Sequence, residues 1–319
     1  MQAERQVSPS GVAATVRAFV REARVVRRQP LGNTWGYLFI APGMILYTVF
    51  NVWPIVRGFA MAFTDYRFLI PGSMWAWNGL DNYVEMFQDK MFWHSFVVSL
   101  KFTAMTFPPG LILSLTAAVL ISQIHWGAGF FRWVIYLPVI TPVSVAMLMW
   151  GQLLGYKFGY INVMLRSLGV EDPPNWLGDV STALVSVAVA DVWNRYGFAT
   201  MLFLIGIYGI NRELYEAAAM DGAGWWTQLL RITLPLLRPV FVLILVLNAG
   251  VVGATEQMLI LTDGGPQNST LTTGLYLYRQ GFQFGDLRLG YAAAMSLFLG
   301  SIHMGLSALV FYCLRTERA

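Results

Sequence analysis

Residues 211–239 read NRELYEAAAMDGAGWWTQLLRITLPLLRP and lie between two long apolar runs, at about 182–207 and 239–261. Glutamate and alanine favour a helix in the first third of this stretch, and Asp221-Gly222 is a turn signal. A second short helix is expected after the turn, and Pro235 suits the entry to the following apolar run. The pattern therefore predicts a helix–turn–helix elbow, residues 211–239, exposed on one side of a membrane.

The first helix of this elbow has an unusually narrow face. Ala217 and Ala218 carry almost no side chain there, and Glu216 places a charge at the rim. A helix of this shape fits into a groove of another protein. The elbow is thus predicted to be a contact element for a partner.

The composition of the whole chain agrees with a membrane location. Of 319 residues, 56% are hydrophobic and 12% are charged, about half the usual charged share. So few charges cannot cover a water-facing surface, which argues against soluble, disordered, collagen-like and nucleic-acid-binding proteins. Because Cys313 is the only cysteine, the sequence offers no internal disulfide framework and no cysteine metal cluster.

Six stretches are long and apolar enough to cross a bilayer, which needs about 20 residues per helix. Each is expected to be helical, because an unpaired backbone group in lipid costs several kcal/mol. The predicted spans are about Gly36–Val56, Phe96–Ile121, Trp133–Leu154, Thr182–Ile207, Pro239–Leu261 and Leu289–Leu314. Pro42, Pro54, Pro108, Pro109, Pro138 and Pro142 interrupt the first three and are expected either to permit motion or only to shape packing.

The distribution of Lys and Arg favours an orientation with both termini in the cytoplasm. The basic residues assigned to the inner side outnumber those assigned to the outer loops, which are about 57–95, 155–181 and 262–288. The inner ones are Arg5, Arg17, Arg21, Arg24, Arg27, Arg28, Arg132, Arg212, Arg231, Arg238, Arg315 and Arg318. The leader, residues 1–35, is either an amphipathic surface helix or a solvated tail that sets the topology.

Enzymatic motifs are not visible in the sequence. None of Lys90, Lys101 and Lys157 lies in a G-K-[ST] loop, so the chain has no Walker-type phosphate cradle. The three histidines, His94, His125 and His303, are far apart, and no G-x-S-x-G elbow occurs. We therefore expect no catalytic role and no cofactor bound by this chain.

The elbow resembles the EAA signature of bacterial ABC importer permeases. That signature is Glu-Ala-Ala, three residues, Gly, nine residues, Ile-x-Leu-Pro, and the matching positions are Glu216, Ala217, Ala218, Gly222, Ile232, Leu234 and Pro235. The resemblance implies that this loop docks into a cleft of an ATPase subunit. It also implies an all-α membrane protein with the type I importer fold of six transmembrane helices and a cytoplasmic coupling loop. On this interpretation the permease domain is 36–315, with the coupling loop 211–239 inside it.

The resemblance extends over nearly the whole chain and is closest to carbohydrate-uptake permeases of the MalF-like type. FNVWPIVRGFAMAFTDYRF (50–68) and NGLDNYVEMFQDKMFW (78–93) are similar to elements of that family, with Ala62 where serine is common. LTDGGP (261–266) resembles the turn after the fifth span. Thr255 departs from the pattern, since a Phe usually precedes the acidic residue there.

The resemblance implies a bacterial inner-membrane subunit of an ATP-driven importer for a sugar or small oligosaccharide. Its implied partners are membrane lipid, a second permease of similar fold, a dimeric ABC ATPase that carries ATP and Mg, and an extracytoplasmic solute-binding protein. A glycerol phosphodiester, polyol or polyamine is an alternative substrate. A stand-alone channel or a membrane enzyme is the alternative from another class.

Polar residues within the spans are the candidates for a substrate path, because ionisable groups in a bilayer usually face a cavity. A sugar needs polar groups for its hydroxyls and aromatic faces for its ring. The candidates are Lys101, Asp191, Trp193, Asn194, Arg195, Tyr196, Asn248, Glu256 and Gln257. If the fifth span is one continuous helix, Asn248, Thr255 and Glu256 share a sector of about 100°. The alternative is that Asp191 and Arg195 neutralise each other, as i,i+4 neighbours.

Overall fold

The structure, a computed structural model, describes residues 34–70, 72–73, 75–124, 126–248 and 255–314. The predicted leader, His125, Arg315 and Arg318 lie outside these residues. The chain divides into two compact units, Met1–Arg57 and Gly58–Ala319. The second unit contains the elbow and every candidate of the substrate path.

The described residues are almost entirely helical, with two isolated β-bridges, Thr64 to Trp77 and Arg67 to Arg288. Two short stretches, η1 and η2, have π-helical geometry. The elements are α2 Thr34–Tyr47, η1 Thr48–Val52, α3 Trp53–Met61, α4 Asp81–Gln88, α5 Lys90–Ser122, α6 Ala128–Ile140, α7 Val143–Leu153, α8 Tyr160–Ser167, α9 Ala183–Tyr208, α10 Arg212–Met220, α11 Trp225–Gln228, η2 Leu229–Thr233, α12 Leu234–Leu236, α13 Arg238–Asn248, α14 Thr255–Leu261, α15 Thr273–Phe282 and α16 Leu289–Leu314.

In the described part of the chain, three helices are long and apolar enough to cross a membrane, and they coincide with the first, second and sixth predicted spans. They are Gly36–Met61, Lys90–Ser122 and Leu289–Cys313. Two bent helix pairs, Ala128–Ile140 with Val143–Leu153 and Trp225–Leu236 with Arg238–Asn248, raise the number in the described part to five if each pair is one span. The fourth predicted span corresponds to α9, a helix of 26 residues with the polar run Asp191–Tyr196 in its middle, which is not among these candidates. The fifth corresponds to α13 and α14, between which residues 249–254 lie outside the described part.

The third predicted span is broken rather than straight. α6 and α7 meet at a bend of 96°, at Thr141-Pro142. Pro142 has no N–H for the carbonyl of Pro138, so the helical ladder is interrupted there. Asn194 Nδ2 on α9 donates to that carbonyl at 2.9 Å. Thr141 Oγ1 covers the next free carbonyl, that of Leu137, at 3.0 Å. By contrast, α5 continues through Pro108 and Pro109.

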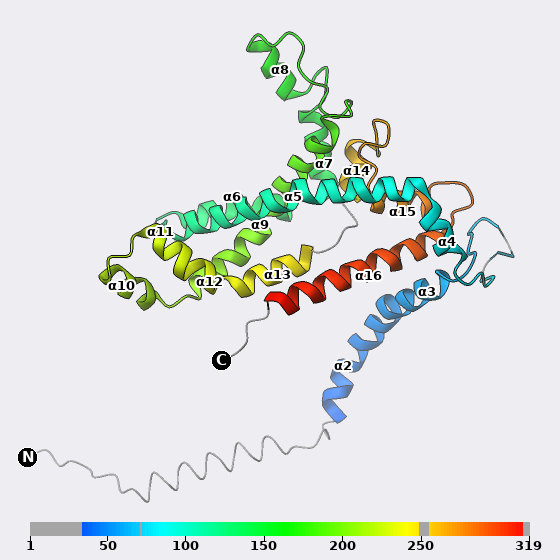
Figure 1. Ribbon diagram of the computed structural model, residues 1–319, viewed down its shortest axis with the longest axis horizontal. Coiled ribbons are helices and arrows are strands. Elements are labelled where there is room, and N and C mark those ends of the chain that lie inside the picture. The colour runs from blue at the N-terminus through cyan, green and yellow to red at the C-terminus, as the bar shows by residue number, and fades with distance from the viewer. Residues whose placement is uncertain (1–33, 71, 74, 125, 249–254, 315–319) are drawn as a thin grey trace, which may run out of the picture. The chain divides into compact units, whose positions relative to one another are not determined.

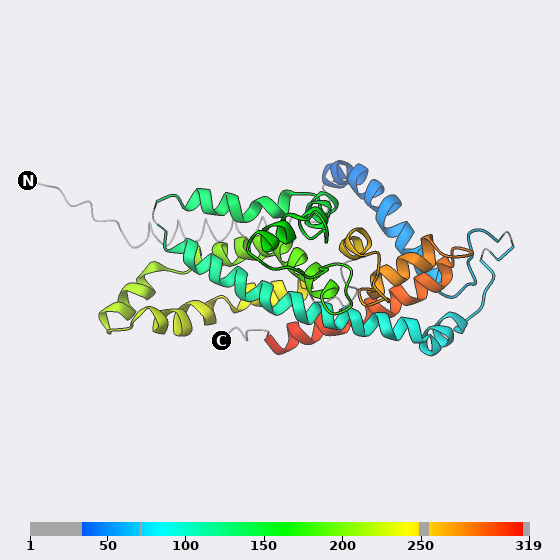
Figure 2. The same cartoon turned by 90° about the horizontal axis from the view of Figure 1, so that it is seen from above.

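The second unit is organised around α5 and α9, which form its most extensive helix pair. Both views show them side by side, with α6 next to α9 (Figures 1 and 2). Glycine permits this closeness: a Cβ at Gly197 would lie 2.3 Å from the carbonyl oxygen of Ile135 on α6. Similarly, a Cβ at Gly206 would meet Leu237 at 2.6 Å.

Asp89 connects several elements at the end of the unit where α5 begins. One carboxylate oxygen caps α5 by accepting from the Met91 N–H at 2.8 Å. The other accepts from Tyr276 Oη on α15 at 2.5 Å and from Tyr291 Oη on α16 at 2.8 Å. Burial raises the pKa of Asp89, but these hydrogen bonds outweigh it and hold the pKa below its usual value. Burial and the neighbouring carboxylate in turn raise the pKa of the Tyr276 hydroxyl.

Two of the three predicted outer loops meet at this same end. Arg67 Nη1 donates to Asp286 at 3.0 Å, and Arg288 forms a bidentate pair with Glu85. The elbow lies at the opposite end of α5 from α4 and α15 (Figure 1). These two predicted outer loops therefore lie together, away from the elbow, whereas the third, 155–181, which carries α8, lies elsewhere (Figure 1).

Replacement of Gly197 by alanine is expected to destabilise the unit, by about 1–3 kcal/mol, because a backbone carbonyl cannot move aside for the new methyl group. The purified protein in detergent should show a lower thermal midpoint. Gly300→Ala on α16 is the matched control, since no atom lies within 4 Å of its added Cβ. Equal midpoints for the two variants would contradict the close α6–α9 contact.

Asp89→Asn is expected to remove charge-assisted bonds while keeping a good helix cap. Because the folded-state pKa of Asp89 is lowered, its contribution to stability is present above the unfolded pKa of about 3.9 and is lost as the pH falls through the folded pKa. The wild-type protein should thus unfold at a higher temperature than the variant at pH 7, with the difference disappearing below about pH 4. Asp179→Asn, at an exposed position, should show no such pH-dependent difference.

Candidate functional site

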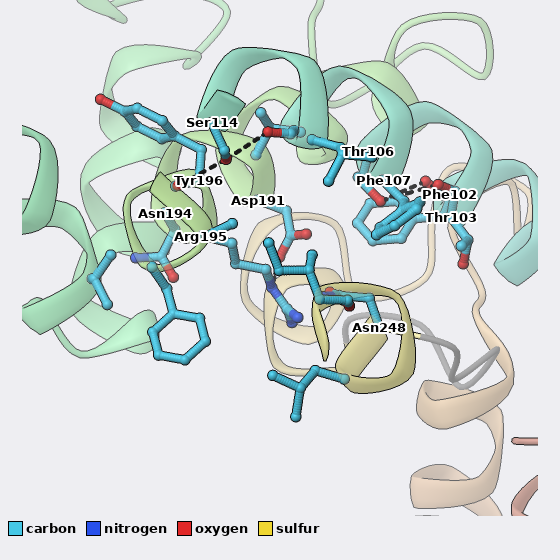
Figure 3. Close-up of a pocket in the computed structure, with 18 residues that line it drawn as sticks. Phe102, Thr103, Thr106, Phe107, Ser114, Asp191, Asn194, Arg195, Tyr196 and Asn248 are labelled. Atoms are coloured by element: carbon cyan, nitrogen blue, oxygen red, sulfur yellow. Dashed lines mark hydrogen bonds and ion pairs between the residues drawn. The ribbon is translucent and has the colours of Figure 1, made fainter. Parts of the chain in front are cut away.

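A cavity of about 550 Å³ lies among α5, α6, α9 and α13 (Figure 3). Its apolar walls include the aromatic rings of Phe102, Phe107, Tyr196 and Phe198. Five of the predicted path residues line it as well: Asp191, Asn194, Arg195, Tyr196 and Asn248. Aromatic faces combined with a few polar groups are the usual lining of a small-molecule site.

Two polar side chains of the cavity lining, Asp191 and Arg195, are linked to a third, Gln257, which lies behind them. Arg195 Nε donates to Asp191 Oδ1 at 2.8 Å, one turn along α9. Gln257 Nε2, from α14, donates to the same oxygen at 2.7 Å. The Asp191 side chain is 5% exposed, whereas that of Arg195 is 56% exposed. Asp191 is therefore a buried anchor that holds the guanidinium group at the cavity.

Asn194 has a structural partner. Its side chain lines the cavity, but its amide nitrogen is committed to the Pro138 carbonyl at the break between α6 and α7. The residue is buried. Asn248, the last residue of α13, is different, because it is exposed and its one side-chain bond among the described residues is within its own helix, to the Ile244 carbonyl at 2.8 Å. Within this part of the chain, Asn248 therefore keeps polar atoms available for a ligand.

The remaining predicted path residues do not line this cavity. The Trp193 ring packs against Trp150 on α7, with centroids 5.9 Å apart, and faces a separate apolar cavity of about 610 Å³. Lys101 on α5 and Glu256 on α14 are exposed. The predicted placement of Asn248 and Glu256 on one face of the fifth span requires a continuous helix through residues 249–254. These residues lie outside the described part, so the placement stays a prediction.

The sequence analysis missed the contribution of α5. Phe102, Thr103, Thr106, Phe107, Gly110 and Ser114 line the cavity. Their spacing of three or four residues places them on one helix face, a pattern visible in the sequence. The three hydroxyls donate to backbone carbonyls: Thr103 to that of Ser99, Thr106 to that of Phe102, and Ser114 to that of either Gly110 or Tyr196, which lie 2.6 and 2.8 Å away. Because their protons are used in this way, the three hydroxyl oxygens can only accept hydrogen bonds from a ligand in the cavity.

The elbow forms the predicted helix–turn–helix. Asn211 caps α10 by accepting from the Glu213 N–H at 3.1 Å, and Arg212 pairs with Glu216 at 3.2 Å across one turn. Gly222 ends the helix with φ +81°, a left-handed conformation that favours glycine. The second helix begins at Trp225 and continues through η2 to Leu236, so Ile232, Leu234 and Pro235 follow the turn on a helical segment.

Side-chain bonds hold the two halves of the elbow together. Tyr215 Oη lies 2.9 Å from Thr233 Oγ1, and Gln228 Nε2 donates to the Ala223 carbonyl at 3.2 Å. No residue of α10 is buried. Met220 and Trp226 are 90% and 67% exposed. The elbow is thus an internally braced element that presents apolar side chains outward, as expected of a docking surface.

Long apolar helices, a polar cavity among them and an exposed, braced elbow define a membrane transport subunit. A family model described as "Binding-protein-dependent transport system inner membrane component" matches residues 110–314. The chain belongs to this family. It is consequently a multi-pass membrane protein of a transport system, and not the enzyme of that system.

Curated relatives and solved structures agree. The trehalose/maltose transport system permease protein MalF of Thermococcus litoralis is 31% identical over 83% of this chain and 88% of its own. The lactose transport system permease protein LacF of Rhizobium radiobacter is 29% identical over 89% of this chain and 95% of its own. A chain of a bacterial ABC transporter for import of the acidic polysaccharide alginate shares the fold, with a TM-score of 0.78 at 23% identity, covering 94% of this chain and all of that one.

The two cavity asparagines are expected to respond differently to leucine. Asn194→Leu removes one of the two hydrogen bonds that the Pro138 carbonyl accepts, the other being that from the Thr141 N–H at 3.3 Å. The loss of this bond between helices, about 0.5–1.5 kcal/mol, should lower the thermal midpoint. Asn248→Leu removes no partner from another element and should leave the midpoint nearly unchanged. A similar loss of stability in both variants would refute the assigned role of Asn194.

Proposed function

We propose that this chain is one of two membrane subunits of an ATP-driven importer and forms half of the path for a sugar or small oligosaccharide. The observation that carries the proposal is the exposed elbow, with Glu216, Ala217 and Ala218 on a free helix and Gly222 at a left-handed turn. The trehalose/maltose and lactose permeases to which the chain is similar support a carbohydrate substrate.

The topology of the proposal is six spans with both termini in the cytoplasm. The fourth span would be α9, and the fifth would comprise α13 and α14. The pairing of Arg67 with Asp286 and of Glu85 with Arg288 supports placing loops 57–95 and 262–288 on one side of the membrane. The elbow, at the other end of α5, would then face the cytoplasm together with the basic leader of residues 1–35.

The motor of the importer would be a separate pair of ATPase subunits, which hold ATP and Mg. One of them would bind the elbow through Glu216–Gly222 and the apolar side chains around it. A second permease of similar fold would complete the pore, and a solute-binding protein would deliver substrate on the outer side. Because Tyr215 and Gln228 brace the elbow internally, a push on α10 would be transmitted to α13 as a rigid-body motion.

The substrate path would pass through the cavity of α5, α9 and α13. Phe102, Phe107 and Phe198 offer apolar faces for a sugar ring, and Asn248 offers amide atoms for hydroxyls. Asp191 and Gln257 would act indirectly, by fixing the position of Arg195. Lys101, Trp193, Asn194, Tyr196 and Glu256 remain proposed path residues, with Asn194 serving mainly to hold the α6–α7 break.

Gly222→Val is expected to uncouple ATP hydrolysis from uptake. A β-branched residue at φ +81° is strained by roughly 1–2 kcal/mol, so the turn should change conformation and α10 should shift. In proteoliposomes containing the assembled importer, sugar taken up per ATP hydrolysed should fall about tenfold.

The matched control is Gly224→Val, two residues along the same turn. Its φ is −70°, which valine adopts readily, and no atom lies within 4 Å of the added Cβ at either position. This variant should keep most of its coupling. Wild-type coupling in Gly222→Val, or purification of an active importer without any ATPase subunit, would count against the proposed role of the elbow.

A further inference from the structure

The guanidinium group of Arg195 is only partly used by the protein. Its Nε bonds to Asp191, and in the described part of the chain neither Nη1 nor Nη2 has a hydrogen-bond acceptor. The side chain is 56% exposed, although it lies at the middle of a long helix. A pair that served only to neutralise charge would be expected to form a bidentate bond and to be buried on both sides.

The free end of the guanidinium is held in a fixed direction. Asp191 is buried, and its Oδ1 accepts a second hydrogen bond from Gln257, so the carboxylate that binds Arg195 Nε is held in place. Because Nε is bonded to Asp191, the remaining donors of the planar guanidinium group are Nη1 and Nη2. The bond to Asp191 also fixes the orientation of this plane. Figure 3 shows Arg195 reaching from α9 past Asp191 toward Asn248 on α13.

Among the described residues that line the cavity, no group accepts a hydrogen bond from Nη1 or Nη2 of Arg195. Among the described residues that line it, Asp191 is the only carboxylate, and its bonded oxygen lies on the Nε side of Arg195. The hydroxyls of Thr103, Thr106 and Ser114 donate to backbone carbonyls. A ligand oxygen that approaches Nη1 and Nη2 therefore meets a positive charge and two N–H donors, which suits an anion better than a neutral hydroxyl.

We infer that the transported saccharide is acidic, and that its carboxylate pairs with Nη1 and Nη2 of Arg195 in a bidentate manner. The inference rests on the proposed function and makes Arg195 the residue that determines charge specificity in this path. The rings of Phe102, Phe107 and Phe198 would contact the apolar face of the sugar, while Asn248 binds its hydroxyls. Asp191 and Gln257 are positioning residues, since they act through Arg195.

The test compares matched substrates in the assembled importer with its partner subunits, reconstituted in proteoliposomes. The probes are radiolabelled pairs of disaccharides, each pair consisting of a neutral sugar and its counterpart with a C6 carboxylate, based on glucose, galactose and mannose. Wild-type importer should take up an acidic member at least about tenfold faster than its neutral partner. Arg195→Gln should reduce acidic uptake about tenfold while neutral uptake changes less than about twofold.

Two further variants make the result specific. Lys157→Gln removes one positive charge at an exposed position after α7, outside the cavity lining, and should leave the acidic-to-neutral ratio unchanged. Arg195→Lys keeps the charge but lacks the fork, so its ratio should lie between those of the wild type and Arg195→Gln. It also provides the comparison if the glutamine variant fails to assemble.

The outcomes separate this inference from the proposed function. Uptake of neutral sugars alone by the wild type, or an equal loss of both members in Arg195→Gln, would overturn the acidic specificity and leave sugar import intact. If the wild-type importer takes up neither member of any pair, the carbohydrate function itself fails.

Discussion

The structure depends on one constraint: a backbone in lipid must satisfy its own hydrogen bonds. Helices do this without help, which is why the apolar stretches are helical. Where proline breaks the ladder, side chains take over, and the bend at Thr141-Pro142 shows how. The Pro138 carbonyl receives Asn194 from α9, and the Leu137 carbonyl receives the Thr141 hydroxyl. A sharp bend can thus exist in a helix pair that carries few polar residues.

The same constraint governs how charges are distributed in the second unit. Asp89 lies at the start of α5, where it caps the helix and accepts two tyrosine hydroxyls. Asp191 lies within α9 and is satisfied by Arg195 and Gln257. Arg195, by contrast, has no acceptor among the described residues for its two terminal nitrogens, which lie at a cavity. An ionisable group that is exposed inside a helix bundle is costly to maintain, and a ligand of opposite charge supplies a reason to retain it.

Much of the candidate site could be predicted by counting residues along a helix. Asp191 and Arg195 are one turn apart, so their pairing was the alternative that the sequence offered, and the structure has this ion pair at the cavity. The α5 wall was not predicted, because sequence gives the face of a helix but not which neighbour that face meets. The bond from Gln257 to Asp191 joins residues 66 positions apart. The spacing of residues along the chain does not indicate such a contact. It also does not indicate that the Trp193 ring packs against Trp150 rather than lining the cavity.

The sequence by itself determined the helical membrane class, the position of the elbow and the family resemblance, because hydropathy, turn signals and motif spacing are local properties of the chain. The tertiary structure decided which polar residues share a cavity and which brace the fold. Asn194 and Asn248 are equally plausible ligands in the sequence, yet of the two only Asn194 donates, among the described residues, to a carbonyl on another helix, at the break where Pro142 supplies no N–H. Helix packing alone brings those two groups together.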